Sequence, residues 1–399
     1  HLPNAFDHPR MAKVAASKVM VKRIAIVSGC LSSQGGGVPR SVSRQALLLK
    51  ENGVDIALFA GRSKAYPFTP KELGIEGCAI HSSALWGPGV LGFFPKALYQ
   101  LWKQAERFDV IHLNGGWNLT TFLGALIARR RNVPYVISCR SHYGDYHFSR
   151  HPLLKKSLFQ LMEKSNARHA LALHVTADWE AKTSWRAVEH AKRVVKIPNP
   201  VNLSDFQNPP TRKESRKQLG LAENDFYILH LGRLGKQKNL PFLLEAFHQA
   251  KLGPNAHLVL IGPPEQDEKR RMEHRVAELG LVDHVSFIDF AAGRERCHWF
   301  SAANLFALPS FDENFCVSAI ESVASGTPCL LSPRVGATEF LPEHLMRELP
   351  LELGIWVDAL EKEFAKKGEQ QAPPPEALAA FSSSAIAEAW LKFYQENIS

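Results

Sequence analysis

Short apolar runs alternate with amphipathic segments of helix length along almost the whole chain, and this alternation restricts the fold more than any other feature. The runs are rich in Val, Ile and Leu, which is typical of strands buried on both faces of a sheet. Strands separated by helices are expected to pair in parallel, as βαβ units. The predicted strands are residues 23–28, 55–60, 110–113, 135–138 and 172–176 in the first half, and 227–231, 257–261, 285–288, 305–308 and 328–331 in the second.

The alternation occurs once in each half of the chain, which predicts two similar α/β domains. The length of 399 residues agrees, since an average domain has about 100–150 residues. Prolines interrupt "KIPNPVN" near residue 200, and regular structure is expected to stop there. We therefore predict a first domain over residues 11–200, a second over residues 201–379, and a closing helix over residues 380–399 that can cross back to the first domain. We expect residues 1–10 to be an addition ahead of a native start at Met11.

The net charge is distributed unevenly between the two halves. The chain carries 48 Lys and Arg against 39 Asp and Glu, a net charge of +9. Residues 1–200 hold 28 basic and 12 acidic side chains, whereas residues 201–399 hold 20 and 27. A basic domain indicates an anionic partner, and both nucleic acid and anionic lipid headgroups fit. The alternative is a surface charge that serves only solubility.

The composition also indicates the cellular compartment of the protein. The six cysteines form no CxxC pair, and several lie in predicted strands, so we expect free buried thiols and a reducing compartment. Residues 1–20 lack the continuous apolar core of a secretory signal. The longest mostly apolar stretch, residues 84–94, has about half of the ~20 residues that a spanning helix needs. We therefore expect a cytoplasmic protein, at most peripheral on the inner face of the cell membrane.

Glycines and cations follow the opening strand of each half, where parallel sheets bind ligands. In "SGCLSSQGGGVPRSV", Gly36 and Gly37 precede a predicted helix, and bare N–H groups at a helix start bind anions. In "GRLGKQKN", Arg233 and Lys238 suit a pyrophosphate. The arginine can donate two parallel hydrogen bonds to it, and the lysine can interact with it as a compact positive charge. A flexible turn and a solvated basic loop are the alternatives. Neither segment contains GxGxxG or GK[ST], which argues against a dehydrogenase and an NTPase.

The segment "PSFDENFCVSAIESVASGTP" carries the strongest signal. Glu313 lies in the turn after a predicted strand, and Glu321 lies eight positions later in an apolar predicted helix. The N–H groups of Asn314, Phe315 and Cys316 are expected to point from the helix start at an anion. Carboxylates accept hydrogen bonds from vicinal hydroxyls, which sugars and riboses present. The alternative is a helix-start acid and a surface glutamate.

Several segments, in the right order and spacing, together resemble the family-four glycosyltransferases over residues 22–340. "ENFCVSAIESVASGTP" resembles the E-x7-E segment of that family, and "GRLGKQKN" resembles its Arg–Lys diphosphate loop. "KIPNPVNLSDF" resembles the segment that joins the two domains, and "HVTADWEAK" resembles a segment before it. "PYVISCRSHYG" and "KKSLF" occupy the places of two acceptor-side features. The resemblance implies a GT-B fold, in which two Rossmann-like βαβ domains face each other across a cleft.

The resemblance also implies a reaction, namely retaining, metal-independent transfer of a hexosyl unit from a nucleotide sugar, with a UDP-sugar as the expected donor. The acceptor would be a saccharide or a lipid-linked saccharide of a cell-surface polysaccharide pathway. No cofactor, metal or nucleic-acid partner is expected. By resemblance, the diphosphate is bound by Arg233 and Lys238 and approached by Gly36 and Gly37, and the amides of Asn314, Phe315 and Cys316 also face the donor. Glu313 holds the donor sugar, Glu321 holds the ribose, and Pro264 lines the base. His112 is a catalytic sugar contact, and Arg140 and His142 lie on the acceptor side.

The sequence departs from the family pattern at three places. Cys316 and Asn239 stand where the family has glycine, and Val335-Gly336-Ala337 stands where it has two glycines. A Cβ at residue 316 would crowd the diphosphate. These departures concern the choice of donor rather than the class of reaction.

A basic amphipathic segment in the first half suggests a lipid surface as a further partner. From residue 95 onward a helix with basic edges is expected, a pattern typical of membrane-surface helices. We hypothesise that the first domain docks on anionic lipid to reach a lipid-linked acceptor. The alternative is an ordinary core helix. The apolar candidates are Trp86, Phe93, Phe94, Leu98 and Trp102, with Lys96, Lys103 and Arg107 beside them.

Two other functions stay open on the sequence alone. A UDP-sugar 2-epimerase with the same fold would release a free sugar without an acceptor. A basic nucleic-acid-binding protein would suit the charge of the first half, but it needs aromatic side chains beside the cations. The acidic second half, which carries the strongest motifs, does not suit nucleic acid.

Overall fold

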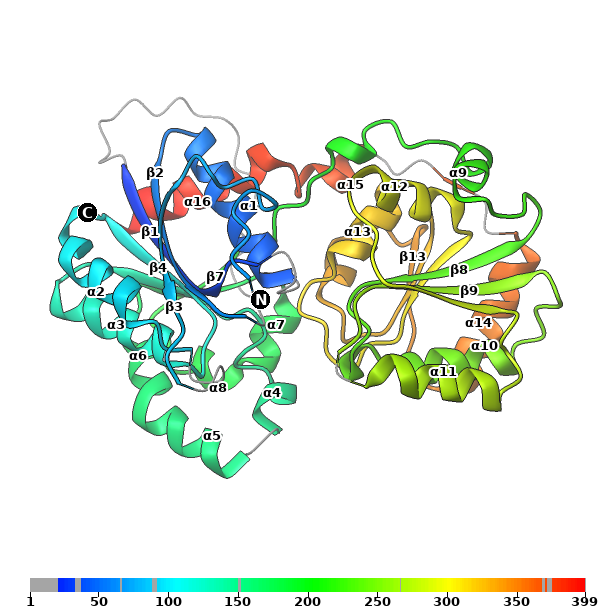
Figure 1. Cartoon of the computed structure of the whole chain (residues 1–399), viewed down its shortest axis with the longest axis horizontal. Helices are drawn as coiled ribbons and strands as arrows, with labels where there is room; N and C mark the ends of the chain where they lie inside the picture. Colours follow the sequence, from blue (N-terminus) through cyan, green and yellow to red (C-terminus); the bar gives the residue numbers. More distant parts are fainter. Residues whose placement is uncertain are drawn as a thin grey trace. The chain divides into compact units, whose positions relative to one another are not determined.

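The computed structural model describes residues 21–32, 37–64, 67–87, 92–149, 152–265, 267–367, 370–371 and 375–398. The described residues form two compact units. The first comprises the chain up to Pro200 together with the last segment from Ser383, and the second runs from Val201 to Ser382. Each unit is a parallel sheet covered by helices (Figure 1), which confirms the predicted fold class of two Rossmann-like units.

The first unit contains a seven-stranded sheet in the order β3-β2-β1-β4-β5-β6-β7, and its strand pairs are all parallel. The order reverses between β1 and β4, and open parallel sheets bind ligands at the carboxyl ends of strands beside such a reversal. The strands are β1 (Arg23–Cys30), β2 (Asp55–Arg62), β3 (Ala79–Ala84), β4 (Val110–Asn114), β5 (Tyr135–Ser138), β6 (Ala172–Val175) and β7 (Val194–Lys196).

Helices cover both faces of this sheet because successive strand residues point to opposite sides. In β1, Ile24 and Ile26 pack in one core with the helices α1 and α16, whereas Ala25 and Val27 pack in another with α2 and α3. The helices of the unit are α1 (Gly37–Glu51), α2 (Pro95–Gln104), α3 (Leu119–Arg130), α4 (Asp145–Ser149), α5 (Pro152–Leu158), α6 (Lys164–His169), α7 (Asp178–Thr183), α8 (Trp185–Val188) and α16 (Ser383–Asn397), with a π-helical turn η4 (Phe159–Glu163) after α5.

The second unit repeats the design with six strands in the order β10-β9-β8-β11-β12-β13, reversing between β8 and β11. Its strands are β8 (Phe226–Leu231), β9 (Ala256–Ile261), β10 (Val285–Ile288), β11 (Leu305–Leu308), β12 (Cys329–Leu331) and β13 (Met346–Glu348). Its helices are α9 (Arg212–Leu219), α10 (Leu240–Gln249), α11 (Glu268–Glu278), α12 (Gly293–Ala302), α13 (Val317–Ala324), α14 (Leu353–Ala365) and α15 (Pro375–Ala379).

All ten predicted strands are present, and three further strands were missed. The missed strands β3, β7 and β13 lie at the edges of the two sheets. Edge strands need no continuous apolar run, because one side of each has no strand neighbour. The sequences "AIHSSA" of β3 and "MRE" of β13 accordingly carry polar side chains that hide the strand signal.

A buried chain of hydrogen bonds attaches α16 to the sheet of the first unit. Tyr394 Oη lies 2.7 Å from His112 Nδ1, and His112 Nε2 lies 2.6 Å from Ser138 Oγ. Ser138 Oγ lies 2.7 Å from His174 Nδ1, and His174 Nε2 lies 2.8 Å from the Ile197 carbonyl oxygen. Every donor has an acceptor when both imidazoles are neutral and carry the proton on Nε2. Burial lowers the pKa of both rings, to about 3 for His174, which keeps them neutral at physiological pH.

The described part of the chain was searched for membrane spans and metal clusters. None of its helices is both long and apolar enough to cross a membrane. Nor do its His, Cys, Asp and Glu side chains form a group of three or more that could hold a metal ion.

Candidate functional site

The loops that follow β8 and β11 carry the motifs of the second unit. The two strands are neighbours where the strand order reverses, so both loops start from the same edge of the sheet. The Phe311 N–H donates a hydrogen bond to the Gln237 carbonyl oxygen at 2.8 Å and joins the two loops. A parallel bridge between Glu313 and Val335 connects the loop that follows β12. Three loops therefore converge at the carboxyl edge.

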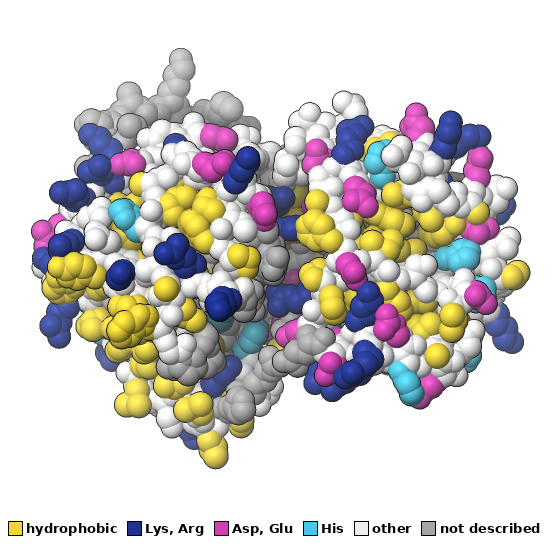
Figure 2. All heavy atoms as spheres, in the orientation of Figure 1, with side chains coloured by type: hydrophobic (Ala, Val, Ile, Leu, Met, Phe, Trp, Pro, Cys, Tyr) yellow, Lys and Arg dark blue, Asp and Glu magenta, His cyan; other side chains and the backbone are white. Residues whose placement is uncertain are grey.

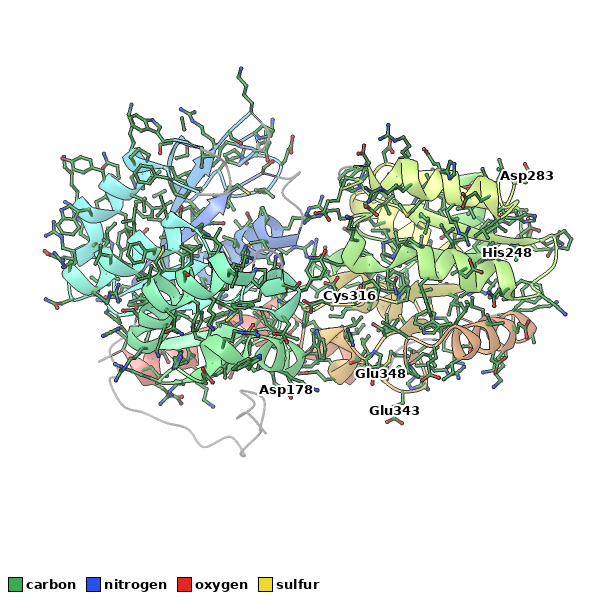
Figure 3. The ribbon with its side chains drawn as sticks, turned by 90° about the horizontal axis from the view of Figure 1, so that it is seen from below. Asp178, His248, Asp283, Cys316, Glu343 and Glu348 are labelled. Atoms are coloured by element: carbon green, nitrogen blue, oxygen red, sulfur yellow. The ribbon has the colours of Figure 1, made fainter. Side chains whose placement is uncertain are left out.

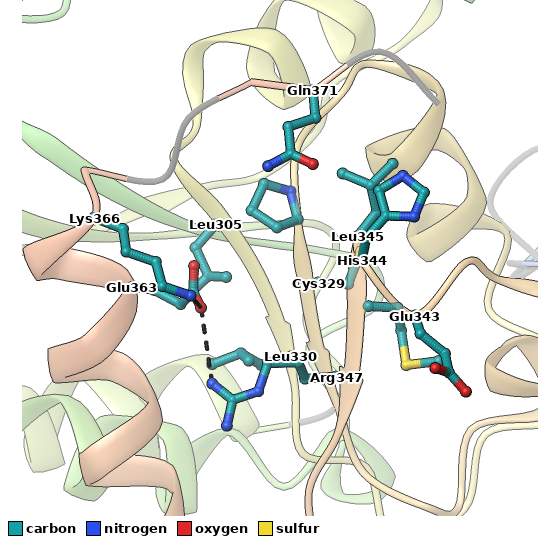
Figure 4. Close-up of a pocket in the computed structure, with 12 residues that line it drawn as sticks. Leu305, Cys329, Leu330, Glu343, His344, Leu345, Arg347, Glu363, Lys366 and Gln371 are labelled. Atoms are coloured by element: carbon teal, nitrogen blue, oxygen red, sulfur yellow. Dashed lines mark ion pairs between the residues drawn. The ribbon is translucent and has the colours of Figure 1, made fainter. Parts of the chain in front are cut away.

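This edge is the opposite of the one that carries the hollow of Figure 4. In Figure 3, Cys316 lies at one end of the second unit, whereas His248, near the end of α10, and Asp283, before β10, lie at the other. The hollow of about 480 Å³ is lined by residues at the amino ends of β11, β12 and β13. Its ion pair, Arg347–Glu363, spans 3.8 Å. The hollow therefore does not belong to the candidate site.

Lys238 and Glu313 form an ion pair between the two central loops. Their side chains are only 17% and 16% exposed, so water screens the pair weakly. Burial lowers the pKa of Lys238, and the nearby Arg233 lowers it further, whereas nearby acids such as Asp312 and Glu265 raise it. Two cations at one sheet edge favour an anionic ligand. The sequence predicted Arg233, Lys238 and Glu313 for one site, and the structure brings them together.

Two residues that flank this ion pair have left-handed backbone conformations. Asn239 (φ 54°) precedes α10, and Cys316 (φ 71°) precedes α13. Both stand where the resembled family has glycine, which adopts positive φ without a steric penalty. Asparagine tolerates this region, whereas a left-handed cysteine costs roughly 1–2 kcal/mol. The backbone therefore supplies a reason for glycine at these positions that is separate from the crowding expected at residue 316.

The helix α13 begins beside Lys238, at Val317. Asn314 and Phe315 therefore lie in the loop that leads into the helix, and the role of their N–H groups toward an anion stays a prediction. Cys316 is the N-cap, and burial raises the pKa of its thiol to about 11 although Lys238 acts in the opposite direction. A helix N-terminus carries partial positive charge and binds anions. The site thus combines a helix N-terminus with two cations.

The loop that follows β9 lies against the loop that follows β8. Pro264 forms a parallel bridge with Leu234. Gly262 has a φ of 145°, and a Cβ at this position would overlap the Gly232 carbonyl oxygen, so only glycine fits. Pro264, the predicted base-lining residue, is therefore fixed beside the loop that carries the cations.

Glu321 lies farther along α13 and is paired with a residue that the sequence analysis missed. Its side chain is 5% exposed, and its carboxylate contacts the guanidinium of Arg296 on α12. The sequence "GRERCHWF" around Arg296 reads as an ordinary charged helix start, so no pattern indicated this contact. Glu321 is not the surface residue of the alternative interpretation, because it is buried with a cationic partner.

In the first unit, the loops after β4 and β5 contain three residues with left-handed backbones, Trp117 (φ 61°), Arg140 (φ 50°) and Ser141 (φ 62°). Such residues store about 1–3 kcal/mol of strain each and cluster at functional sites. Two buried carboxylates hold these loops. Glu163 accepts a hydrogen bond from the Trp117 N–H at 2.7 Å, and Glu180 accepts one from the Ser141 N–H at 2.8 Å. Burial raises the pKa of both carboxyl groups.

Arg140 and His142, the predicted acceptor-side residues, both lie after β5 but differ in accessibility. Arg140 is buried and donates to the side-chain oxygens of Asn114 and Asn199 at 3.1 and 2.6 Å. Burial lowers its pKa to about 10, so it stays charged at neutral pH. His142 is half-buried, and its ring stacks on that of His147 at 5.7 Å. Arg140 thus supports the loop from inside, and the ring of His142 is the more accessible of the two.

Of the three other predicted residues of the first unit, His112 does not join the site as expected, and the roles of Gly36 and Gly37 stay predictions. His112 is completely buried in β4, and both of its ring nitrogens belong to the hydrogen-bond chain that holds α16. Such a ring does not reach a sugar in this structure, so we interpret it as structural rather than catalytic. Gly37 is the first residue of α1. Gly36 lies outside the described residues, and its role stays a prediction.

Two family models match the chain over successive stretches. A glycosyl transferase 4-like domain matches residues 36–200, and the glycosyl transferases group 1 model matches residues 211–349. The two stretches cover most of the chain, one in each half. The chain therefore belongs to the glycosyltransferases that contain this pair of domains. Membership of this class argues against the nucleic-acid-binding alternative.

Curated relatives belong to the same class. An uncharacterized glycosyltransferase from Methanocaldococcus jannaschii is 26% identical over 63% of this chain and 63% of its own length. An alpha-monoglucosyldiacylglycerol synthase from Streptococcus pneumoniae is 27% identical over 59% of this chain and 54% of its own. A D-inositol 3-phosphate glycosyltransferase from Pseudarthrobacter chlorophenolicus is 24% identical over 83% and 82%. The matches thus span less than two thirds of the first two relatives.

Solved structures share the fold. A sucrose-phosphate synthase from Thermosynechococcus elongatus has a TM-score of 0.76 at 22% identity, covering 94% of this chain and 98% of that one. HepE from Anabaena, crystallised with UDP and glucose, has a TM-score of 0.73 at 18% identity, covering 94% and 100%. At these identities the likeness shows the GT-B fold alone.

The left-handed backbone at residue 316 predicts the order of stability of two variants. Cys316→Gly and Cys316→Ala both remove the sulfur, but only glycine avoids a Cβ at a φ of 71°. We expect the glycine variant to be more stable than the alanine variant by about 1 kcal/mol, measured by urea unfolding. An alanine variant of equal or higher stability would contradict the left-handed conformation.

Proposed function

We propose that the chain is a retaining hexosyltransferase that moves a sugar from a UDP-sugar to a saccharide or lipid-linked saccharide. The observation that carries this proposal is the Lys238–Glu313 ion pair at the start of α13. Positive charge for a diphosphate and a carboxylate for sugar hydroxyls lie side by side there. HepE, whose crystal contains UDP and glucose, has the same fold, and this supports a UDP-sugar as the donor.

In the proposed reaction, the bond between the anomeric carbon and the diphosphate oxygen breaks, and the diphosphate leaves with the bonding electrons. Lys238, Arg233 and the N-terminus of α13 stabilise the negative charge that develops on the leaving group. Glu313 accepts hydrogen bonds from the donor sugar. The acceptor hydroxyl forms the new bond on the same face of the sugar and gives its proton to the departing diphosphate oxygen. In this scheme, fixed charges of the protein stabilise the leaving diphosphate as a metal ion would.

The remaining donor contacts are proposed from the resemblance and from position. Glu321 would hold the ribose, and the loop with Pro264 would line the base. A UDP-sugar 2-epimerase would use the same donor contacts without an acceptor. We favour transfer to an acceptor, because both matching models are those of glycosyl transferases.

Donor binding gives a direct prediction for Lys238. In EDTA, we expect UDP to bind wild type more tightly than GDP or ADP. Lys238→Ala should weaken UDP binding by about tenfold or more, because a charged hydrogen-bond partner is worth about 1.5–3 kcal/mol. Isothermal titration calorimetry measures both effects. Lys236→Ala, which removes an exposed lysine from the same turn, is the matched control. Equal UDP affinity in wild type and Lys238→Ala would rule out this site.

The first unit also exposes apolar side chains next to basic ones, as Figure 2 shows. On α2, Tyr99 and Trp102 are 55% and 38% exposed. They line an apolar groove of about 310 Å³ between α2 and α3. Cations lie over both rings, with Lys103 Nζ 4.6 Å from the Tyr99 centroid and the Arg131 guanidinium 4.1 Å from the Trp102 centroid. The groove is therefore edged by positive charge.

This face agrees with the predicted one at Phe93 and Trp102, which line the groove, and differs from it elsewhere. Phe94 is buried in the core beneath α2, so it is not available to a partner, whereas Leu98 is 5% exposed where it lines the groove. Instead, α5 and η4 add three leucines that the sequence analysis did not name. Leu153, Leu154 and Leu161 are 82%, 59% and 74% exposed, beside the two lysines of "KKSLF".

We propose an anionic bilayer surface as the partner of these apolar and basic side chains. Aromatic rings suit the headgroup level, and each nearby Lys or Arg adds about 1 kcal/mol on an anionic membrane. Among the relatives is an alpha-monoglucosyldiacylglycerol synthase, whose name denotes a lipid product. A lipid-linked acceptor would be reached from such a surface.

The docking proposal predicts a loss of binding to vesicles. A Tyr99→Ser/Trp102→Ser double variant should bind vesicles of equal phosphatidylcholine and phosphatidylglycerol at least about tenfold more weakly than wild type. Cosedimentation measures this, and UDP affinity should not change. Trp185→Ser is the control, because Trp185 is another exposed aromatic of the same unit, 46% exposed on α8. Unchanged vesicle binding by the double variant would contradict the proposal.

A further inference from the structure

Arg296 is a largely buried cation to which the proposed reaction gives no part. It lies on α12 and contacts Glu321 on α13, and the two side chains are 17% and 5% exposed. Moving both charges out of water is unfavourable, and a well-packed apolar pair would stabilise the helix contact equally well. A purely structural role therefore does not explain why these two helices meet through charges.

The contact leaves hydrogen-bonding capacity on both partners. Arg296 contacts the Oε2 atom of Glu321 through Nη2. Within the described part of the chain, the Oε1 atom of Glu321 accepts no hydrogen bond, and the other guanidinium nitrogens of Arg296 donate none. A carboxylate accepts at both oxygens, and a guanidinium has five N–H donors. An acceptor and a set of donors therefore lie next to each other.

A vicinal diol is the ligand that complements this arrangement. Each hydroxyl both donates and accepts, so one hydroxyl can donate to a carboxylate oxygen while its neighbour accepts from a guanidinium N–H. A ribose presents two such hydroxyls on adjacent carbons. The planar guanidinium also holds the carboxylate in one orientation, which a lysine does less well.

The position along α13 suits the ribose of a bound nucleotide. Glu321 follows Cys316, the N-cap, by five residues, which is about 7.5 Å along the helix axis. A diphosphate at the helix N-terminus would place the ribose, its direct covalent neighbour, at a comparable distance. Glu321 and Arg296 thus lie within reach of the sugar of the nucleotide rather than of its phosphates.

We propose that Arg296 is a specificity-determining residue that, together with Glu321, recognises the two ribose hydroxyls of the donor nucleotide. One hydroxyl donates to the carboxylate of Glu321, and the neighbouring hydroxyl accepts from the guanidinium. This inference rests on the proposed function, since it assumes a nucleotide bound at the start of α13.

Deoxynucleotides test the proposal, because a merely structural ion pair would not distinguish them. Calorimetry would compare UDP, 2′-deoxy-UDP and 3′-deoxy-UDP on wild type, Arg296→Leu and Arg296→Lys. We expect wild type to bind UDP at least about tenfold more tightly than one of the deoxy analogues. Arg296→Leu should lose most of this preference, by weakening UDP while changing the affinity for that analogue less than about twofold. Arg296→Lys should restore part of it.

The controls keep folding and function apart. Arg294→Leu removes an exposed arginine of the same helix and should keep the wild-type preference. Where Arg296→Leu does not fold, Arg296→Gln replaces it, since the amide keeps two N–H donors without the charge. An Arg296 variant that folds and keeps the full preference for UDP, or that weakens all three ligands equally, overturns the proposal. A wild type that binds no nucleotide overturns the proposed function instead, and with it this inference.

Discussion

The ion pair between Lys238 and Glu313 is the interaction on which the site of the second unit depends. The two residues are 75 positions apart in the sequence, and they meet because β8 and β11 are neighbours at the reversal of the strand order. The low exposure of both side chains raises the strength of their attraction and also the penalty of leaving either one alone. A diphosphate sugar suits this pair, since its phosphates compensate the cation and its hydroxyls compensate the carboxylate.

The first unit holds its loops by a different device. Glu163, Glu180 and Arg140 are buried charges, and each is compensated by hydrogen bonds from or to neighbouring groups. These bonds fix backbones that would otherwise leave the left-handed region at Trp117 and Ser141. Rigid loops of this kind position ligands without a loss of conformational entropy at the moment of binding. The strain in the first unit and the largely buried ion pair in the second are two ways of preparing a site in advance.

Much of the fold was predictable, because apolar runs mark central strands. The edge strands β3 and β13 were not, since half-solvated strands carry no such run. In the site, Arg233, Lys238 and Glu313 could be found because each follows a strand and resembles a family motif. Arg296 could not, because its role comes from packing α12 against α13, which no local pattern encodes.

Other errors have a common physical cause. His112 was assigned to a sugar because it lies near a strand end, but sequence does not show whether a histidine faces a ligand or the core. The burial of Phe94 and the exposure of Leu153 were likewise hidden. The sequence of a short amphipathic segment does not show which of its apolar residues point to the core and which point to solvent. The conformation at Cys316 was also hidden, since the usual signal for a positive φ is glycine.

The most direct test of the account is to follow a UDP-hexose by ¹H NMR in EDTA, with water as the acceptor. UDP-glucose and UDP-galactose, both α-linked, are incubated separately with wild type and with Lys238→Ala. We expect wild type to release UDP and free hexose in equal amounts from one of them, with the α-anomer appearing first. Lys238→Ala should be slower by about a hundredfold or more. First appearance of the β-anomer, or equal rates for the two proteins, would contradict it.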